Sequence, residues 1–281
     1  MKGKTVVITG ASSGIGQVTA HELARRGARI VMVVRNAAKG QRVIDEIHRA
    51  FPEAKLELAI ADLYSLAEVR RVGAEIRASH PKIDVLVNNA GLIHDKRELT
   101  VDGFERTFAL NHLAAFLLTY ELRESLAAAA PARIVTVSSE GHKFSRIDWN
   151  QLATGADWKL GTLTYGNSKL CNLWFARESS RRLATEGITS NAVHPGPVAT
   201  GFGQSGSIVY RLGTKLAKPF LLTPEEGART SIYVASSPDV EGVTGQYFIK
   251  CRIAKPSSRA RDDASARRLW ELSEKLTGVA Y

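Results

Sequence analysis

Tyr165 and Lys169 stand four residues apart near the start of a predicted long helix that runs towards Ala184. Residues at that spacing share one face of a helix, so the phenol and the ammonium can point into the same cleft. A phenol ordinarily titrates at about pH 10, and a neighbouring positive charge lowers its pKa. Tyr165 could then protonate a carbonyl oxygen or deprotonate an alcohol. Because such pairs also arise by chance, other groups must support this chemistry.

Polar residues that could assist such a pair follow two predicted strands. Ser138 and Ser139 come directly after one of them, where a hydroxyl can hydrogen-bond a substrate oxygen as charge develops on it. The stretch 88–91, Asn-Asn-Ala-Gly, ends the other and offers amides and a small residue where a cofactor passes. Asn111 lies in the next predicted helix and could hold a water beside Lys169. Each of these residues, taken alone, is better explained by a capping or packing role than by a catalytic one.

Short β-branched runs alternate with longer helix-compatible stretches, which is typical of βαβ units and of a parallel sheet covered on both faces. The predicted strands are at 6–8, 30–34, 56–60, 85–87, 134–137, 190–193 and 246–249. The predicted helices are at 17–26, 37–50, 66–79, 104–129, 165–184 and 262–276. Glycines and prolines crowd the segment after the sixth strand, which predicts a substrate loop over about 196–222.

A glycine-rich turn, residues 9–16, follows the first predicted strand and opens the first helix. Its glycines permit a tight turn and the close approach of backbone N–H groups to a pyrophosphate, which the helix N-terminus also stabilises. The predicted cofactor contacts in this turn are Gly10, Ser12, Ser13, Gly14, Ile15 and Gly16. The sequence therefore predicts one α/β domain over residues 1–281, with a Rossmann-type doubly wound parallel sheet of about seven strands and helices on both faces.

The end of the second predicted strand indicates which dinucleotide is bound. Folds that prefer NAD place an acidic residue there to hold the ribose 2′-OH, whereas this chain has Arg35, which can pair with the 2′-phosphate of NADP. Asn36 and Lys39 are predicted contacts beside it, Lys39 as a second positive charge. Asp62, with Leu63 next to it, is a candidate for the adenine edge. We therefore predict NADP(H) as the cofactor.

Charge and composition exclude several other classes of protein. The net charge of +10 is scattered and interleaved with acidic residues, which favours solvated helix faces over a nucleic-acid groove. Charge alone leaves attraction to an anionic membrane surface open. Cys171 and Cys251 form no CxxC pair, so neither a disulfide framework nor a metal site is expected. The longest apolar run, 113–118, is too short to span a bilayer and no secretory signal is present, so a cytoplasmic location is predicted.

Together, in this order and on these element ends, the residues from Thr5 to about Ser236 resemble the short-chain dehydrogenase/reductase family. The resemblance implies that the catalytic tetrad falls on Asn111, Ser139, Tyr165 and Lys169. Ser139 is preferred to Ser138 because the family places its catalytic serine second in such pairs. Lys169 would also hold the nicotinamide ribose. The other cofactor contacts that it implies are Asn89, Ala90, Gly91, Pro195, Gly196, Val198 and Thr200.

A closer resemblance is to the retinol dehydrogenase-like branch, including its bacterial relatives. It is carried by Arg35 and by the stretches 111–113, 140–164, 193–196 and 245–248. We do not expect the N-terminal membrane segment of the vertebrate members of that branch in this protein, so a retinoid is one candidate substrate among several. Bulky residues in the segments that usually wall the substrate pocket predict a lipophilic aldehyde, ketone or alcohol, although plain loop packing would also account for Phe144, Trp149, Phe202 and Tyr210.

Two other functions are compatible with parts of the pattern. One is a light-dependent protochlorophyllide reductase-like enzyme, which would also use NADPH with a tyrosine and a lysine. The other is a catalytically silent dinucleotide-sensing protein, which the intact tetrad disfavours. Relatives assemble as dimers or tetramers through the helices that contain Asn111 and Tyr165, whereas some of the nearest branch are monomers, so a homo-oligomer is expected on the resemblance alone.

Overall fold

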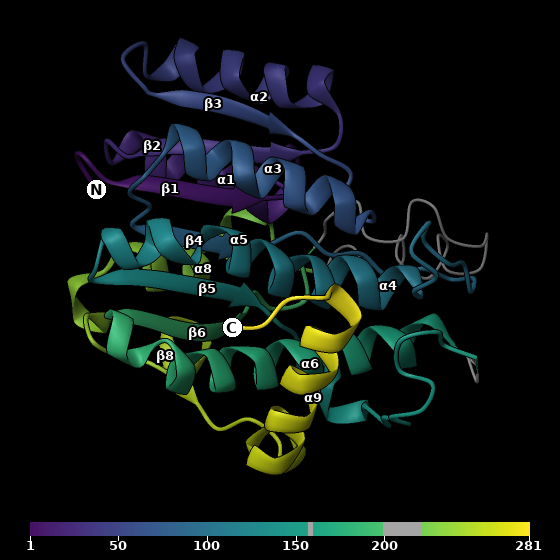
Figure 1. The fold of residues 1–281 in the computed structure, drawn as a ribbon. Helices are drawn as coiled ribbons and strands as arrows, with labels where there is room; N and C mark the ends of the chain where they lie inside the picture. The colour runs from purple at the N-terminus through teal and green to yellow at the C-terminus, as the bar shows by residue number, and fades with distance from the viewer. Residues whose placement is uncertain (157–159, 199–220) are drawn as a thin grey trace.

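The computed structural model describes residues 1–156, 160–198 and 221–281. Its strands form one sheet in the order β3-β2-β1-β4-β5-β6-β7-β8, parallel throughout except that β8 runs antiparallel to β7 (Figure 1). The strands are β1 Thr5–Thr9, β2 Arg29–Val34, β3 Leu56–Ile60, β4 Val85–Asn88, β5 Ala132–Val137, β6 Ile188–His194, β7 Tyr247–Ile249 and β8 Arg252–Ala254. The predicted doubly wound parallel sheet is confirmed.

The prediction of about seven strands was wrong, because the described sheet has eight. β8 is only three residues long and lies at the edge, where two of its residues are exposed. It follows a tight reversal in which Lys250 and Cys251 both adopt positive φ angles, of 49° and 59°. A strand so short and so exposed has no alternation of apolar residues that could reveal it in the sequence.

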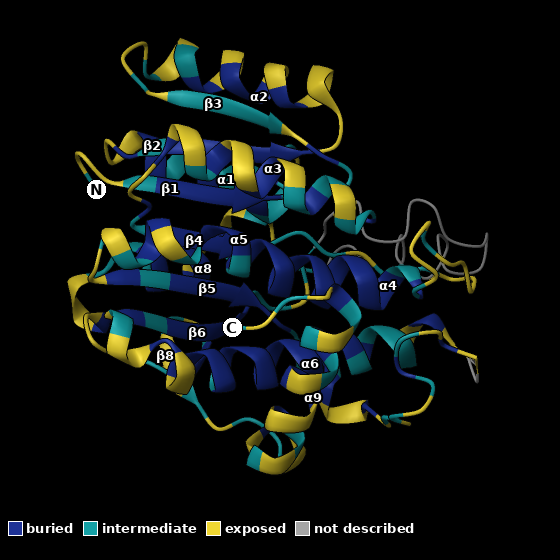
Figure 2. Cartoon of the chain, viewed as in Figure 1, coloured by how far each residue is buried: buried dark blue, intermediate teal, exposed yellow. Residues whose placement is uncertain are grey.

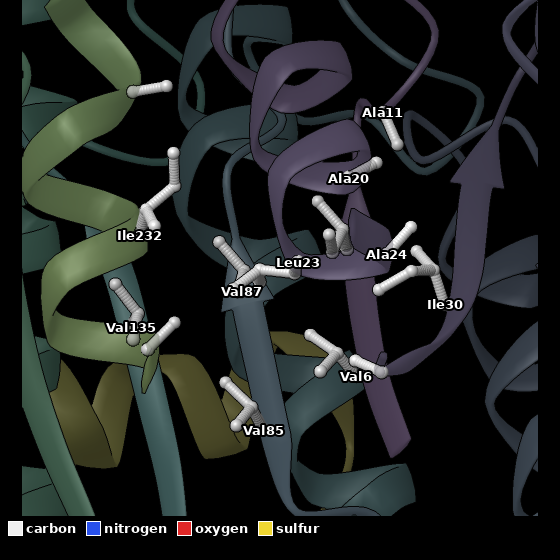
Figure 3. Close-up of a cluster of buried hydrophobic side chains, with 14 of the residues drawn as sticks. Val6, Ala11, Ala20, Leu23, Ala24, Ile30, Val85, Val87, Val135 and Ile232 are labelled. Carbon is white, nitrogen blue, oxygen red and sulfur yellow. The ribbon is translucent and has the colours of Figure 1, made fainter. Parts of the chain in front are cut away.

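Helices cover both faces of the sheet. On one face lie α1 Gly14–Arg25, α2 Ala37–Ala50 and α8 Pro224–Ser236; on the other lie α3 Leu66–Ser79, α5 Ala114–Ala128 and α6 Gly161–Arg182. Because side chains alternate along a strand, Val6 and Ile8 pack on the first face and Val7 on the second. Figure 3 shows the first core, where Leu23 of α1 and Ile232 of α8 meet valines of β4 and β5.

Capping residues begin several helices. Asn36 and Ser65 accept hydrogen bonds from the backbone at the first turns of α2 and α3, whose bounds match the predicted ones. α8 was not predicted, although Thr223 and Glu226 form a reciprocal capping box with proline at the first helical position. That pattern is a recognisable start signal for a helix.

The predicted helix 104–129 is one run with a π-helical turn inside it. It consists of α4 Arg106–Phe108, the π-helical segment η1 Ala109–Leu113, and α5. Glu105 caps it, because its carboxylate accepts hydrogen bonds from the backbone N–H groups of Thr107 and Phe108. Such π-turns are uncommon and often lie at functional sites. This one contains Asn111.

The C-terminal helix α9 Asp263–Thr277 packs across the outer side of α6, as Figure 1 shows. Trp270 of α9 lies against Phe116 of α5 and Phe175 of α6, with ring centroids 5.0 and 6.1 Å away. Figure 2 shows that α5 and α6 are largely buried. The shorter helical segments are η2 Glu140–Phe144, η3 Ala184–Glu186, η5 Pro238–Val240 and η6 Arg259–Arg261. None of the described helices has the length and apolar character needed to cross a membrane.

Candidate active site

The strand order reverses between β1 and β4, and ligands bind at the carboxyl ends of strands at such a point in open α/β sheets. Here Thr9 and Asn89 join the two strand ends. The Thr9 hydroxyl accepts hydrogen bonds from the backbone N–H groups of Asn89 and Ala90, at 3.0 and 2.9 Å. The Asn89 side-chain amide donates to the Thr9 carbonyl at 2.8 Å. Asn89 therefore positions the glycine turn together with Thr9. The sequence analysis did not foresee the contribution of Thr9.

The glycines of this turn are required by close approach. A Cβ at Gly16 would lie 2.4 Å from the Gly10 carbonyl oxygen and 2.5 Å from the Asn89 amide nitrogen. Gly10 and Gly14 have φ angles of 67° and 54°, which L side chains rarely adopt. The start of α1 can therefore lie directly against the end of β1.

Ser13 is the N-cap of α1, and its side chain makes no capping hydrogen bond within the described residues. The first N–H groups of a helix have no partner inside it, so this end suits an anion such as a phosphate. Ser12 and Ile15 are half-buried on either side, and Ile15 packs against the core beneath α8.

Arg35 is exposed just after β2, and its guanidinium carbon lies 5.8 Å from the centre of the Tyr64 ring. Lys39 is exposed in the first turn of α2. The Asn36 side-chain oxygen accepts from the Lys39 backbone N–H at 2.8 Å, so it serves as the helix cap. Arg106 covers the Tyr64 ring at 4.5 Å. The Tyr64 ring therefore lies beside two guanidinium groups. The sequence analysis did not identify this role of Tyr64.

Asp62 and Leu63 lie past the end of β3, directly before Tyr64. The Asp62 carboxylate is half-buried and accepts from the Tyr64 backbone N–H at 3.2 Å, while Leu63 is buried. The Tyr64 hydroxyl and His94 Nε2 are 2.8 Å apart, which connects this corner to the segment after Gly91. The predicted adenine-side residues therefore lie together.

Lys169 is the buried cation of the site. It is 2% exposed, and its ammonium donates to the Val137 carbonyl at 2.9 Å and lies 5.4 Å from the centre of the Tyr165 ring. Burial away from water lowers the pKa of Lys169 to about 7. Tyr165 is half-buried on the same face of α6, as the spacing predicts.

The two serines after β5 have different surroundings. Ser138 is 1% exposed and donates its hydroxyl to the Lys169 carbonyl at 2.7 Å, so it stabilises the packing of α6 on the sheet. Ser139 is half-buried, and its hydroxyl oxygen accepts from the Gly141 N–H at 3.1 Å. A Cβ at Gly141 would lie 3.5 Å from Ser139 Oγ and 3.7 Å from the Tyr165 ring. Ser139 and Tyr165 therefore flank the same glycine.

Asn111 lies in the π-turn and faces the segment after β4. Its amide nitrogen donates to the Leu92 carbonyl at 3.0 Å and to the Ser168 hydroxyl at 2.9 Å, while its oxygen accepts from Leu92 N–H at 2.9 Å. A Cβ at Gly91 would lie 3.1 Å from Asn111 Oδ1 and 3.2 Å from Lys169 Nζ. The asparagine and the lysine thus converge on Gly91.

The predicted carboxamide-side contacts follow β6. Gly196 has a φ of 90°, and a Cβ there would lie 2.4 Å from the Leu222 side chain. Val198 forms a β-bridge with Leu222, and Pro195 is half-buried. Thr200 and most of the predicted loop 196–222 lie outside the described residues, as do Phe202 and Tyr210.

The two other bulky residues proposed for the substrate wall are described. Phe144 is 78% exposed at the end of η2. Trp149 stacks on Trp174 of α6 with ring centroids 5.6 Å apart, and the Arg268 guanidinium covers it at 4.6 Å. Trp149 therefore packs between α6 and α9.

His142, which the sequence analysis did not single out, holds the Ser139 segment in place. Its Nε2 accepts a hydrogen bond from the Ser257 N–H at 3.2 Å, so Nδ1 carries the hydrogen and donates to the Ser139 carbonyl at 2.7 Å. Its ring packs edge-on against Tyr247, whose hydroxyl donates to Glu140 at 3.1 Å. Its role depends on Ser257, far away in the chain, so no local pattern in the sequence could have revealed it.

Comparison with known proteins gives consistent matches. The short chain dehydrogenase family matches residues 4–207. Retinol dehydrogenase 14 of Mus musculus is 41% identical over 297 residues, covering 99% of this chain and 87% of that protein. The crystal structure of an uncharacterized protein from Mycobacterium paratuberculosis has a TM-score of 0.80 and 35% identity, covering 100% of this chain and 95% of that one. A structure from Beutenbergia cavernae, described as an NAD(P) dependent gluconate 5-dehydrogenase with bound NADP, has a TM-score of 0.71 and 28% identity over 89% of this chain and 96% of that one.

The doubly wound sheet, with a glycine-rich turn and a Tyr-Lys pair at its carboxyl edge, defines an oxidoreductase of the nicotinamide dinucleotide class. The chain belongs to the short-chain dehydrogenase/reductase family, and it is retinol dehydrogenase-like.

Proposed function

We propose that the protein is an NADP(H)-dependent oxidoreductase that transfers a hydride between the nicotinamide and a lipophilic aldehyde, ketone or alcohol, retinoid-like molecules included. The observation that carries the proposal is the buried Lys169 ammonium 5.4 Å from the Tyr165 ring, at the edge of the sheet that also bears Ser139 and Gly91. A buried cation beside a phenol is costly in free energy, so a functional role accounts for it better than packing does.

The residues present fit a dinucleotide. Gly10, Gly16 and Gly91 carry no side chain. The start of α1 offers backbone N–H groups to a phosphate. Arg35 offers a fork of donors suited to a 2′-phosphate. The other cofactor contacts proposed are Ser12, Ser13, Gly14, Ile15, Asn36, Lys39, Asp62, Leu63, Asn89, Ala90, Pro195, Gly196, Val198 and Thr200. When bound, the nicotinamide supplies or accepts the hydride.

The chain's own residues would handle the proton. In reduction the Tyr165 hydroxyl gives its proton to the carbonyl oxygen as the carbonyl carbon becomes an alcohol carbon, and in oxidation the phenolate takes that proton back. The Lys169 charge favours the ionised phenol. The Ser139 hydroxyl donates to the substrate oxygen, and Asn111 fixes the backbone beside Lys169.

A screen of NADPH oxidation over lipophilic aldehydes and ketones tests the proposal, with the Tyr165→Phe protein as the blank. Turnover in the wild type well above that blank is the expected result. If no carbonyl compound is reduced faster than in the blank, the proposed reaction is wrong. The predicted cytoplasmic location and homo-oligomer stay predictions, and the native mass in solution would test the second.

A further inference from the structure

His112 follows Asn111 directly in the π-turn η1, and the two side chains face different parts of the molecule. Asn111 faces the candidate site, whereas His112 Nε2 lies 2.9 Å from Ser273 Oγ in α9. The imidazole is 1% exposed. Its ring lies 5.3, 6.3 and 6.1 Å, between centroids, from Phe108, Phe116 and Phe175. A buried polar ring in an aromatic environment is costly unless it has a specific partner.

The partner at Ser273 fixes the tautomer of His112. The Ser273 hydroxyl donates its one hydrogen to the Leu269 carbonyl at 2.7 Å, so its oxygen accepts from His112 Nε2–H. Nδ1 then carries a lone pair, and it has no well-formed hydrogen bond within the described residues. Burial lowers the pKa of His112 to about 3, and the neighbouring Asn172 side chain opposes that shift. The imidazole is therefore neutral.

Asn172 connects the imidazole to the buried lysine. Its amide nitrogen donates to the Val137 carbonyl at 3.0 Å, and the Lys169 ammonium donates to the same oxygen at 2.9 Å. The Asn172 side chain also lies beside the imidazole, where it favours the charged form of His112 and so raises its pKa. One neutral ring thus lies between α9 and the end of β5.

We propose that His112 is a positioning residue that couples α9 to the candidate site. Through its bond to Ser273 it anchors the π-turn that carries Asn111, and it lies beside Asn172, whose amide shares the Val137 carbonyl with Lys169. A π-turn is less regular than an α-helix, so a side chain that ties it to a second helix helps to hold it. The proposal rests on the proposed function, because it concerns the placing of the proposed Asn111 and Lys169.

Two variants separate positioning from packing. His112→Phe fills the aromatic cage but has no donor for Ser273, while Ser273→Ala leaves the imidazole in place and removes its acceptor. Phe116→Leu is the matched control, because it perturbs the same aromatic cage without touching the polar chain. We expect His112→Phe to lower kcat about tenfold with the KM for NADPH little changed. Phe116→Leu should lower the urea midpoint and leave kcat unchanged.

A second readout uses the cofactor-free protein and needs no activity. The Lys169 amine is followed by NMR in protein with labelled lysine and assigned with Lys169→Arg. His112→Phe should raise its titration midpoint by about half a pH unit or more, because a loosened site admits water and reduces the cost of burying the charge. Tyr165 and His194 are the other titratable groups that act on or lie beside Lys169, and both are unchanged in every variant compared.

The double variant His112→Phe with Ser273→Ala should be no worse than His112→Phe alone, because both changes break one chain of contacts. Additive losses would contradict the proposal, as would a His112→Phe protein that loses only stability while kcat and the Lys169 titration stay at wild-type values. If His112→Phe fails to fold, Ser273→Ala carries the same test in the same direction. If the wild type reduces no carbonyl compound, the proposed function fails, whereas the Lys169 titration still decides the role of His112.

Discussion

Lys169 and Tyr165 lie one helical turn apart on α6, and the ammonium is 5.4 Å from the centre of the phenol ring. The Lys169 amine is buried and donates to a backbone carbonyl, and no carboxylate accepts a hydrogen bond from it in the part of the chain that the structure describes. A cation without a neutralising carboxylate acts more strongly on the phenol. The pair therefore places a phenol beside a charge whose burial is itself destabilising.

Removing the phenol hydroxyl tests the proton transfer. Tyr165→Phe deletes one oxygen on a half-buried residue, so the fold and cofactor binding should remain. Turnover should fall by about a hundredfold or more, because the general acid/base is lost. Ser138→Ala is a useful comparison, since the hydroxyl that it removes bonds α6 to the sheet. Steady-state kinetics with cofactor titration checks both, and undiminished turnover in Tyr165→Phe would remove the assignment.

Replacing Lys169 by methionine should stabilise the protein at pH 7 while abolishing activity. The folded-state pKa is about 7 against 10.5 in the unfolded chain, so between these values the unfolded chain binds the extra proton. Stability therefore rises with pH over that interval. The variant lacks this dependence, and its advantage over the wild type should narrow by about 2 kcal/mol from pH 7 to pH 9. Urea unfolding at the two pH values measures the gap, and a constant gap would contradict the assigned pKa shift.

Arg35 sets the choice of dinucleotide in the proposed function. NADPH should bind at least about tenfold more tightly than NADH, which corresponds to about 1.4 kcal/mol, and Arg35→Ala should remove most of that difference. Arg49→Ala makes the same charge change in the last turn of α2, so it should leave the ratio unaltered. Fluorescence titration of both nucleotides measures the ratio. Equal affinities in the wild type would show that Arg35 does not select the cofactor.

Much of this arrangement could be predicted from the sequence, because βαβ periodicity specifies a parallel sheet and fixes which loops meet at its carboxyl edge. The spacing of Tyr165 and Lys169 gave their shared face on α6 directly. The roles of Thr9 and His142 were not predictable in the same way. Each depends on a contact between segments far apart in the chain, such as the bond from the Ser257 N–H to His142. β8 was not predicted because it is too short to show an alternation of apolar residues. α8 was not predicted either, although its capping box is a start signal that the sequence contains.

The glycine turn provides a steric prediction. Gly16→Ala puts a methyl group 2.4 Å from a backbone oxygen of Gly10, so α1 must move away from the end of β1. We expect a loss of about 1–3 kcal/mol of stability and a large loss of cofactor affinity. Gly103→Ala is the control, because a Cβ there meets nothing within 4 Å, so the change costs only the backbone strain of a φ of 81°. Urea unfolding and nucleotide binding are compared in both, and equal behaviour of the two variants would show that the close approach is unimportant.

Two buried histidines should make the protein sensitive to acid. Burial lowers the pKa of His112 to about 3 and that of His194 to about 4, against 6.5 in the unfolded chain. Below pH 6.5 the unfolded chain binds protons that the folded protein does not, so stability is lost as the pH falls, by up to about 1.4 kcal/mol per pH unit for each histidine. His112→Phe cannot bind that proton, so its urea midpoint should fall less steeply from pH 6.5 to pH 5 than that of the wild type. Phe116→Leu, which keeps both histidines, should retain the full slope, and identical slopes in all three proteins would mean that His112 is not held neutral by the fold.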